Sequence, residues 1–213
     1  MKRKRRGPIG WLFRIIRWII LVCLIVAIYF GYKIYKNVEQ VSSYRQQVTQ
    51  LTQQYQLEGY ENLVLAIIYT ESKGNGTDLM QSSESLTGEQ SLIHSQEESL
   101  NQGMQYLSQA IQAGLDADCD LWTAVQAYNY GLDYIDYVKI NGGTNTTKLA
   151  ERYSKDVVAP FLGNSTEETY RYWRVQSLLY NRGYLYKNGG NFFYAEIVRD
   201  NQVFIELYQK FFN

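Results

Sequence analysis

Hydrophobic residues fill one long segment near the N-terminus. The run from Trp18 to Tyr32 carries no charged side chain, and apolar residues continue to Tyr35. A helix over 18–35 spans about 27 Å, which is close to the hydrocarbon thickness of a bilayer, about 30 Å. The pattern therefore predicts a transmembrane helix at 18–35, preceded by a basic tail at 1–17.

A cleaved signal peptide is the alternative interpretation of this segment. Cleavage requires small residues after the apolar run, but here the run ends in the bulky sequence Tyr29-Phe30-Gly31-Tyr32. An uncleaved anchor is favoured. Because the stretch from Lys2 to Arg6 is basic, the positive-inside rule keeps the N-terminus in the cytoplasm. We expect a single-pass protein of the cell membrane whose remaining chain lies outside the cell.

The next segment, residues 36–57, has an apolar stripe on a polar background. Val41, Tyr44, Val48, Leu51 and Tyr55 recur at steps of three and four residues. This spacing places them on one face of a helix. We predict a helical stalk that packs on the domain formed by residues 58–213.

The pattern of the domain is helical. Residues 61–70 are apolar on most sides, which is typical of a buried helix. Residues 98–113 have apolar side chains at helical spacing, and 121–127 form another short apolar stretch. The sequence predicts a mostly α fold of about seven or eight helices.

The charge distribution argues against nucleic acid as a partner. Nine basic residues and no acidic residue precede Asn37, which leaves 12 basic and 21 acidic residues in the rest of the chain. An acidic body is a poor match for phosphate. The chain has one histidine, His94, and its two cysteines are Cys23, in the membrane segment, and Cys119. We expect no metal site, no disulfide and no cofactor.

Glu71 is the first candidate for chemistry. It follows the buried helix at 61–70 and precedes Gly74 and Gly76, which are plausible helix terminators. The negative end of the helix dipole and apolar neighbours both raise a carboxyl pKa. A carboxylic acid that stays protonated near neutral pH suits the general acid of a glycosidase. From the local sequence alone, a Glu that ends a helix and faces water is the simpler interpretation.

Four short motifs change that balance. They are Glu71-Ser72, Met80-Gln81-Ser82-Ser83-Glu84-Ser85, Ala127-Tyr128-Asn129-Tyr130-Gly131 and Glu168-Thr169-Tyr170-Arg171-Tyr172. Their order resembles the signature of lysozyme-like lytic transglycosylases and goose-type lysozymes. The second motif is similar to a Gram-positive branch. That branch includes the muramidase domain of bifunctional cell-wall hydrolases on conjugative elements and the pneumococcal vaccine antigen A type. The resemblance covers about residues 40–185.

The resemblance implies a role for each matching residue. Glu71 would be the general acid. The groove beside it would be lined by Met80, Gln81, Ser82 and Ser83, the last three bonding to sugar. Tyr128 and Asn129 would bind the saccharide near the cleavage point. Tyr172 would orient Glu71 or contact substrate, although Trp173 stands where the family has a small aliphatic residue.

A second catalytic carboxylate is left open by the sequence. Glu84 is the best candidate by motif, Asp78 and Glu89 are candidates by position, and Glu84 also fits a cap of a turn or helix. Without a second carboxylate, two routes remain. The acetamido group of the substrate could attack, giving a 1,6-anhydro product, or a water held by polar side chains could attack.

The resemblance implies a peptidoglycan hydrolase without a cofactor. We expect an N-acetylmuramidase that cleaves the β-1,4 bond between N-acetylmuramic acid and N-acetylglucosamine. A lytic transglycosylase is the first alternative. The second alternative is a non-catalytic protein that binds peptidoglycan or serves as a scaffold in a secretion or conjugation apparatus, because a fold does not determine a function.

Overall fold

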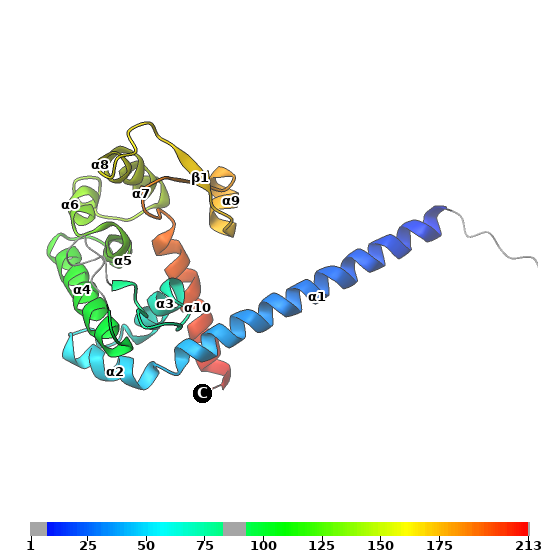
Figure 1. Cartoon of the computed structure of the whole chain (residues 1–213), viewed down its shortest axis with the longest axis horizontal. Helices are drawn as coiled ribbons and strands as arrows, with labels where there is room; N and C mark the ends of the chain where they lie inside the picture. The colour runs from blue at the N-terminus through cyan, green and yellow to red at the C-terminus, as the bar shows by residue number, and fades with distance from the viewer. Residues whose placement is uncertain (1–7, 83–92, 213) are drawn as a thin grey trace, which may run out of the picture.

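Helices form most of the chain in the computed structural model, which describes residues 8–82 and 93–212 (Figure 1). The predicted mostly α class is confirmed. In chain order, the elements are α1 (Pro8–Ser42), α2 (Arg45–Gln54), α3 (Glu61–Glu71), α4 (Gln96–Asp116), α5 (Leu121–Tyr130), α6 (Asp133–Lys139), α7 (Thr147–Tyr153), the π-helical segment η2 (Ser154–Val158), α8 (Ala159–Phe161), β1 (Thr169–Arg171), α9 (Val175–Asn181), β2 (Tyr184–Tyr186) and α10 (Tyr194–Phe212).

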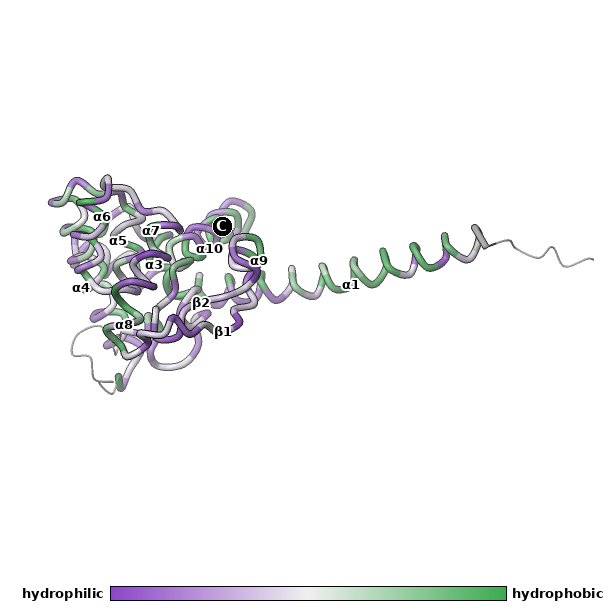
Figure 2. The backbone as a smooth tube through the Cα atoms, turned by 90° about the horizontal axis from the view of Figure 1, so that it is seen from above, coloured by the Kyte–Doolittle hydropathy of each residue, from purple (hydrophilic) through white to green (hydrophobic). Residues whose placement is uncertain are grey.

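Helix α1 joins the apolar N-terminal segment to the domain without a break. Its first part projects from the domain, and hydrophobic residues predominate along it (Figure 2). The stretch from Trp11 to Ser42 is long and apolar enough to cross a membrane, and its most apolar window is unburied. Towards its end, Val38 and Val41 are buried in the domain core. One continuous helix therefore connects the candidate membrane span with the folded domain.

The spacer consists of two helices, whereas its apolar stripe predicts one. Helix α1 ends at Ser42, and α2 begins at Arg45. Between them, the Ser43 hydroxyl donates to the carbonyl of Gln40, 2.7 Å away. Side chains of this kind compete with the helical hydrogen bonds of the backbone. Both helices still pack on the domain, because Val41 and Val48 are buried in one core.

Two hydrophobic cores divide the domain into two lobes. The first lobe contains the end of α1 together with α2, α3, α4 and most of α10, and its core includes Ile67 and Met104. The second contains α6, α7 and β2, and its core includes Tyr134 and Phe193. Helix α5 contributes to both cores, so it forms the wall between the lobes.

A small two-stranded sheet belongs to the second lobe, and helix α9 lies in the connection between its strands. Strand β1 pairs antiparallel with β2, with Thr169 opposite Tyr186 and Arg171 opposite Tyr184. The sequence pattern does not indicate strands here, because three residues are too few to display the alternation that identifies a strand. The motif that ends in Tyr172 comprises strand β1 and one residue on each side of it.

Candidate active site

Helix α3 carries Glu71 at its C-terminal end. Every residue from Leu63 to Tyr69 is buried, which fixes the helix in the first lobe. The helix stops there because Lys73 and Gly74 adopt positive φ angles of 56° and 76°. A Cβ on Gly74 would lie 3.1 Å from the Cγ of Gln40, so a larger residue would press on α1. Glycine is thus required both for the turn and for the close approach.

The chain after Glu71 folds back beside it. The Ser72 hydroxyl donates to the carbonyl of Leu79 at 2.8 Å, which closes the loop. Asp78 then accepts hydrogen bonds from the Ser99 hydroxyl at 2.7 Å and from the backbone N–H of Ser82 at 3.0 Å. Since Ser99 belongs to α4, these bonds fix the segment 78–82 against the first lobe.

A cleft of about 410 Å³ lies between Glu71 and helix α5. The cleft brings together four residues to which the resemblance gives a role: Glu71, Gln81, Tyr128 and Asn129. Its remaining walls are Tyr106, Tyr130 and Gly131. Hydroxyl and amide groups beside aromatic rings can bind a ligand that has both polar edges and apolar faces.

The Glu71 carboxyl is partly buried and hydrogen-bonded. Burial raises its pKa from the ordinary value of 4.5 to about 7, opposed by a hydrogen bond from Tyr194 and reinforced by the negative charge of Asp78. The Tyr194 hydroxyl donates to Oε1 of Glu71 at 2.5 Å. Burial and the nearby Glu71 raise the pKa of Tyr194 well above its ordinary value, so that hydroxyl keeps its proton. Glu71 therefore holds a proton over much of the neutral range.

Tyr194 is the residue of this site that the sequence analysis missed. It lies at the start of α10, 123 positions after Glu71 and beyond the motifs. The ring of Tyr194 is parallel to that of Tyr128, with centroids 6.3 Å apart. Tyr128 in turn donates its hydroxyl to the carbonyl of Met80 at 3.0 Å. Tyr194 and Tyr128 thus connect Glu71 to the segment that contains Met80. No local pattern in the sequence indicates the contact between Tyr194 and Glu71.

Met80 and Ser82 occupy different positions from those expected. The motif implied that both would face the sugar, but Met80 is fully buried and Ser82 is buried as well. The hydroxyl of Ser82 donates to the carbonyl of Ser99 at 3.1 Å. Both residues therefore support the cleft wall from behind, while the side chain of Gln81 lies on the cleft. Two other motif residues, Ser83 and Glu84, lie outside the described residues, as does Glu89.

Asn129 and Tyr172 are connected through Asn191. The backbone N–H of Asn191 donates to Oδ1 of Asn129 at 2.9 Å, and its side-chain amide donates to the Tyr172 hydroxyl at 3.1 Å. Gln126, buried on α5, fixes the same segment by donating to the carbonyl of Asn191 at 2.9 Å. The described hydrogen bond to Glu71 comes from Tyr194 and not from Tyr172. Tyr172 is connected to the cleft residue Asn129 through Asn191.

We expect the Tyr194→Phe variant to raise the pKa of Glu71 further. The hydroxyl of Tyr194 stabilises the charged carboxylate, so its removal leaves burial unopposed. Carbon NMR of side-chain-labelled glutamate would follow the titration, with Glu71→Gln identifying the signal. Tyr172→Phe is the matched control, and its Glu71 signal should titrate as in the wild type. A lower pKa in Tyr194→Phe would contradict the assigned hydrogen bond.

Comparisons with known proteins identify the family of this chain. A family model described as lysozyme-like matches residues 38–202. The pneumococcal vaccine antigen A homolog of Streptococcus pyogenes serotype M1 is 42% identical over 94% of this chain and 100% of its own length. The bifunctional muramidase/DL-endopeptidase CwlT of Bacillus subtilis is 38% identical over 44% of this chain and 28% of its own length.

A solved structure shows the same fold. The crystal structure of a protein similar to an NLP/P60-family lipoprotein from Staphylococcus aureus superposes with a TM-score of 0.68 at 33% identity. The match covers 77% of this chain, which spans about half of that longer protein, 52%. Because the family match takes in both lobes and the relative from S. pyogenes aligns over nearly the whole chain, this protein belongs to the lysozyme-like family.

Proposed function

We propose that this protein is an N-acetylmuramidase. It hydrolyses the β-1,4 bond between N-acetylmuramic acid and N-acetylglucosamine in peptidoglycan, with Glu71 as general acid. The observation that carries the proposal is the carboxyl of Glu71 in the cleft, with a pKa of about 7. The name of the B. subtilis relative, which includes a muramidase, supports the same substrate.

Tyr194 determines which oxygen of Glu71 delivers the proton. Its hydroxyl donates to Oε1, so the proton of the neutral acid resides on Oε2. During hydrolysis, Oε2 gives this proton to the glycosidic oxygen as the bond to the anomeric carbon of N-acetylmuramic acid breaks. A water molecule adds its oxygen to that carbon and loses one proton to the solvent or to a base. The carboxylate left behind is stabilised by the same tyrosine hydrogen bond.

Amide groups on the cleft walls suit an N-acetylated sugar. Oδ1 of Asn129 accepts from Asn191, and no residue in the described part of the chain accepts from the amide nitrogen of Asn129, so that nitrogen can donate to a ligand carbonyl. Gln81 supplies a second amide on the facing wall. The rings of Tyr106 and Tyr130 offer apolar surface for the faces of a sugar ring. Tyr172 is proposed as a more distant substrate contact.

A lytic transglycosylase is the second candidate function. Among the described residues that line the cleft, Glu71 is the carboxylate. Asp78 lies nearby, but its Oδ1 accepts from Ser99 and Ser82. Glu71 would then act first as acid and afterwards as base, taking the proton of the C6 hydroxyl as that oxygen attacks the anomeric carbon. Glu84 is proposed as the second carboxylate only for the hydrolytic route.

Digestion of purified peptidoglycan by the full chain in mild detergent tests these proposals. Mass spectrometry of borohydride-reduced products would identify the sugar at the new end. Reduced N-acetylmuramic acid is expected for the muramidase, whereas reduced N-acetylglucosamine would contradict the proposed bond. Products that resist reduction and are lighter by one water would establish the transglycosylase. No release from walls of several species would favour the scaffold alternative.

The location follows from the same sequence features. We propose that α1 crosses the cell membrane with its basic start in the cytoplasm and the domain outside. The anchor restricts cleavage to the wall beside the membrane. That placement suits local opening of the wall for growth, or for a secretion or conjugation apparatus.

A further inference from the structure

An exposed apolar face lies beside the candidate membrane helix. It is formed by Trp173, Val175 and Leu179 in and before α9 and by Val203 and Phe204 of α10, and we call it the α9–α10 face. Leu179 is 83% exposed and Trp173 is 71% exposed. Large apolar side chains grouped this way on a surface mark an interaction site.

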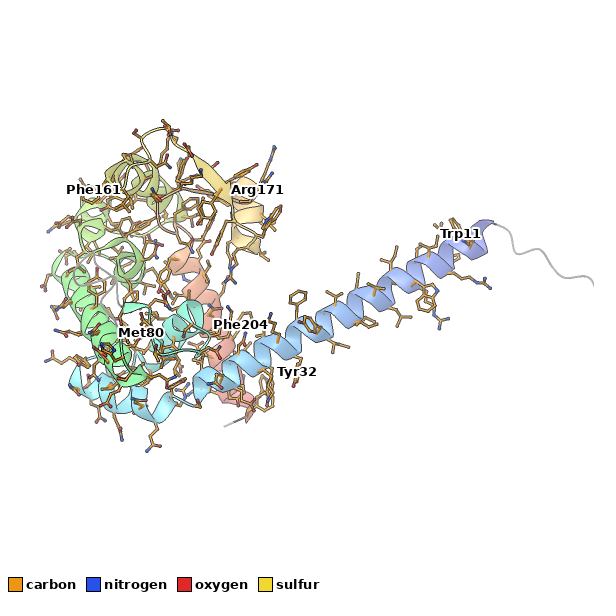
Figure 3. The ribbon with its side chains drawn as sticks, in the orientation of Figure 1. Trp11, Tyr32, Met80, Phe161, Arg171 and Phe204 are labelled. Atoms are coloured by element: carbon orange, nitrogen blue, oxygen red, sulfur yellow. The ribbon has the colours of Figure 1, made fainter. Side chains whose placement is uncertain are left out.

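This face and helix α1 share one groove. The groove, about 760 Å³ in volume, is lined by Phe30 and Ile34 of α1 together with the residues of the α9–α10 face. Figure 1 shows α9 and α10 on the side of the domain from which α1 projects, and Figure 3 shows Phe204 on the α1 side of α10. Whatever surrounds α1 at Phe30 therefore also contacts this face.

The depth of Phe30 in the bilayer indicates which environment surrounds the α9–α10 face. In the proposed membrane segment at 18–35, Phe30 lies five residues before the outer end, or about 7–8 Å along a helix. Apolar faces of interfacial helices lie about 5–10 Å into the boundary between headgroups and acyl chains. The α9–α10 face is therefore at the depth where such a surface is stable in a bilayer.

The domain is held rigidly at this depth. Helix α1 has no break between the membrane segment and the core, where Val41 is buried. The end of α10 packs against α1. The centroid of the Tyr35 ring lies 5.7 Å from that of Tyr208 and 5.3 Å from that of Phe212. Phe211 and Phe212 are themselves exposed, at the level where the membrane segment ends. Apolar side chains therefore accompany α1 on both sides.

The polar groups around the face suit the headgroup region. The guanidinium of Arg171 lies 5.4 Å from the ring of Trp173 and 4.1 Å from that of Tyr184. Tryptophan, tyrosine and arginine together are typical of membrane–water interfaces, where the ring is half immersed and the charge reaches phosphate. Asp200, in the same groove, accepts a hydrogen bond from Gln176 at 2.7 Å, so its carboxylate has a partner.

We propose that the α9–α10 face sits in the outer leaflet of the same bilayer that α1 crosses. The inference rests on α1 spanning the membrane and is independent of the reaction at Glu71. The domain then contacts the bilayer surface directly, and its orientation relative to the membrane is restricted. The cleft has one height and one orientation above the membrane, so cleavage is limited to glycan strands at that height.

Fluorescence quenching by spin-labelled lipid tests the seating. The full chain, with Cys119→Ser throughout, carries an NBD fluorophore on a single cysteine in vesicles of phosphatidylcholine and phosphatidylglycerol. The test site is Leu179→Cys, and the matched control is Phe161→Cys, which is 87% exposed on the side of the domain away from α1 (Figure 3). Both chains also carry Cys23→Ser. The natural Cys23, on exposed α1 surface, reports on the anchor.

Nitroxide placed near the top of the acyl chain should quench the label at 179 strongly and the label at 161 hardly at all. Nitroxide placed deep in the acyl chain should quench the NBD label on Cys23. An unquenched label at 179, with Cys23 quenched, would overturn the seating and leave the anchor intact. Protection of 179 from aqueous iodide without lipid quenching would show a second copy on this face instead. If Cys23 were also unquenched, the anchor and the seating would fail together, while the reaction at Glu71 would be unaffected.

Discussion

The Glu71→Gln variant is expected to lose about a hundred- to ten-thousandfold in the rate of peptidoglycan cleavage, which is the usual contribution of a general acid. The amide of Gln has nearly the shape of the carboxyl and still accepts the hydrogen bond from Tyr194. It has no acidic proton to give to the leaving sugar. The change therefore removes the chemistry while it keeps the packing of the cleft. Initial rates of muropeptide release measure the loss.

The control for this prediction is Glu97→Gln, an exposed carboxylate in the first turn of α4. That variant should cleave at the wild-type rate, since Glu97 is not among the described residues that line the cleft. Binding of both variants to insoluble walls would be measured in parallel. Wild-type cleavage by Glu71→Gln would exclude Glu71 as the acid, whichever bond is broken.

Local patterns in the sequence predicted the features that depend on local physics. The apolar segment 18–35 predicts a membrane helix because its length and apolarity are sufficient. The buried helix before Glu71 was predictable from its composition, and so was the direction of the Glu71 pKa, because burial shifts a carboxyl in one direction only. The motifs supplied the residues of the cleft, of which Gln81 and Asn129 lie on its walls.

The features that the sequence did not predict depend on contacts between distant segments. A motif gives residue types, but it does not say which way Met80 or Ser82 faces, and α4 determines that through Ser99. The tyrosine beside Glu71 comes from α10, where Tyr194 is one aromatic residue among many in a chain with 20 tyrosines. Its role appears only when α10 packs against α3 in the first lobe.

The Glu71→Gln variant should also be more stable than the wild type at alkaline pH, by about 2–3 kcal/mol. In the folded protein the pKa of Glu71 is about 7, against an ordinary value of 4.5. Between these values the unfolded chain releases the proton and the folded chain keeps it, so the free energy of unfolding falls as the pH rises. Above the folded pKa the full penalty of a buried charge is present. Gln does not titrate and has no such penalty.

Thermal unfolding of both full chains in the same detergent at a series of pH values measures this difference. At about pH 8 the variant should unfold about 5–10 °C above the wild type, and below about pH 4 the two should coincide. Every other titrating group is common to both chains and cancels in the comparison. A difference that did not change with pH would mean that Glu71 titrates normally, and the main support for its role as the acid would be lost. A higher stability combined with lost cleavage would show that the site keeps a destabilising carboxyl because the reaction needs its proton.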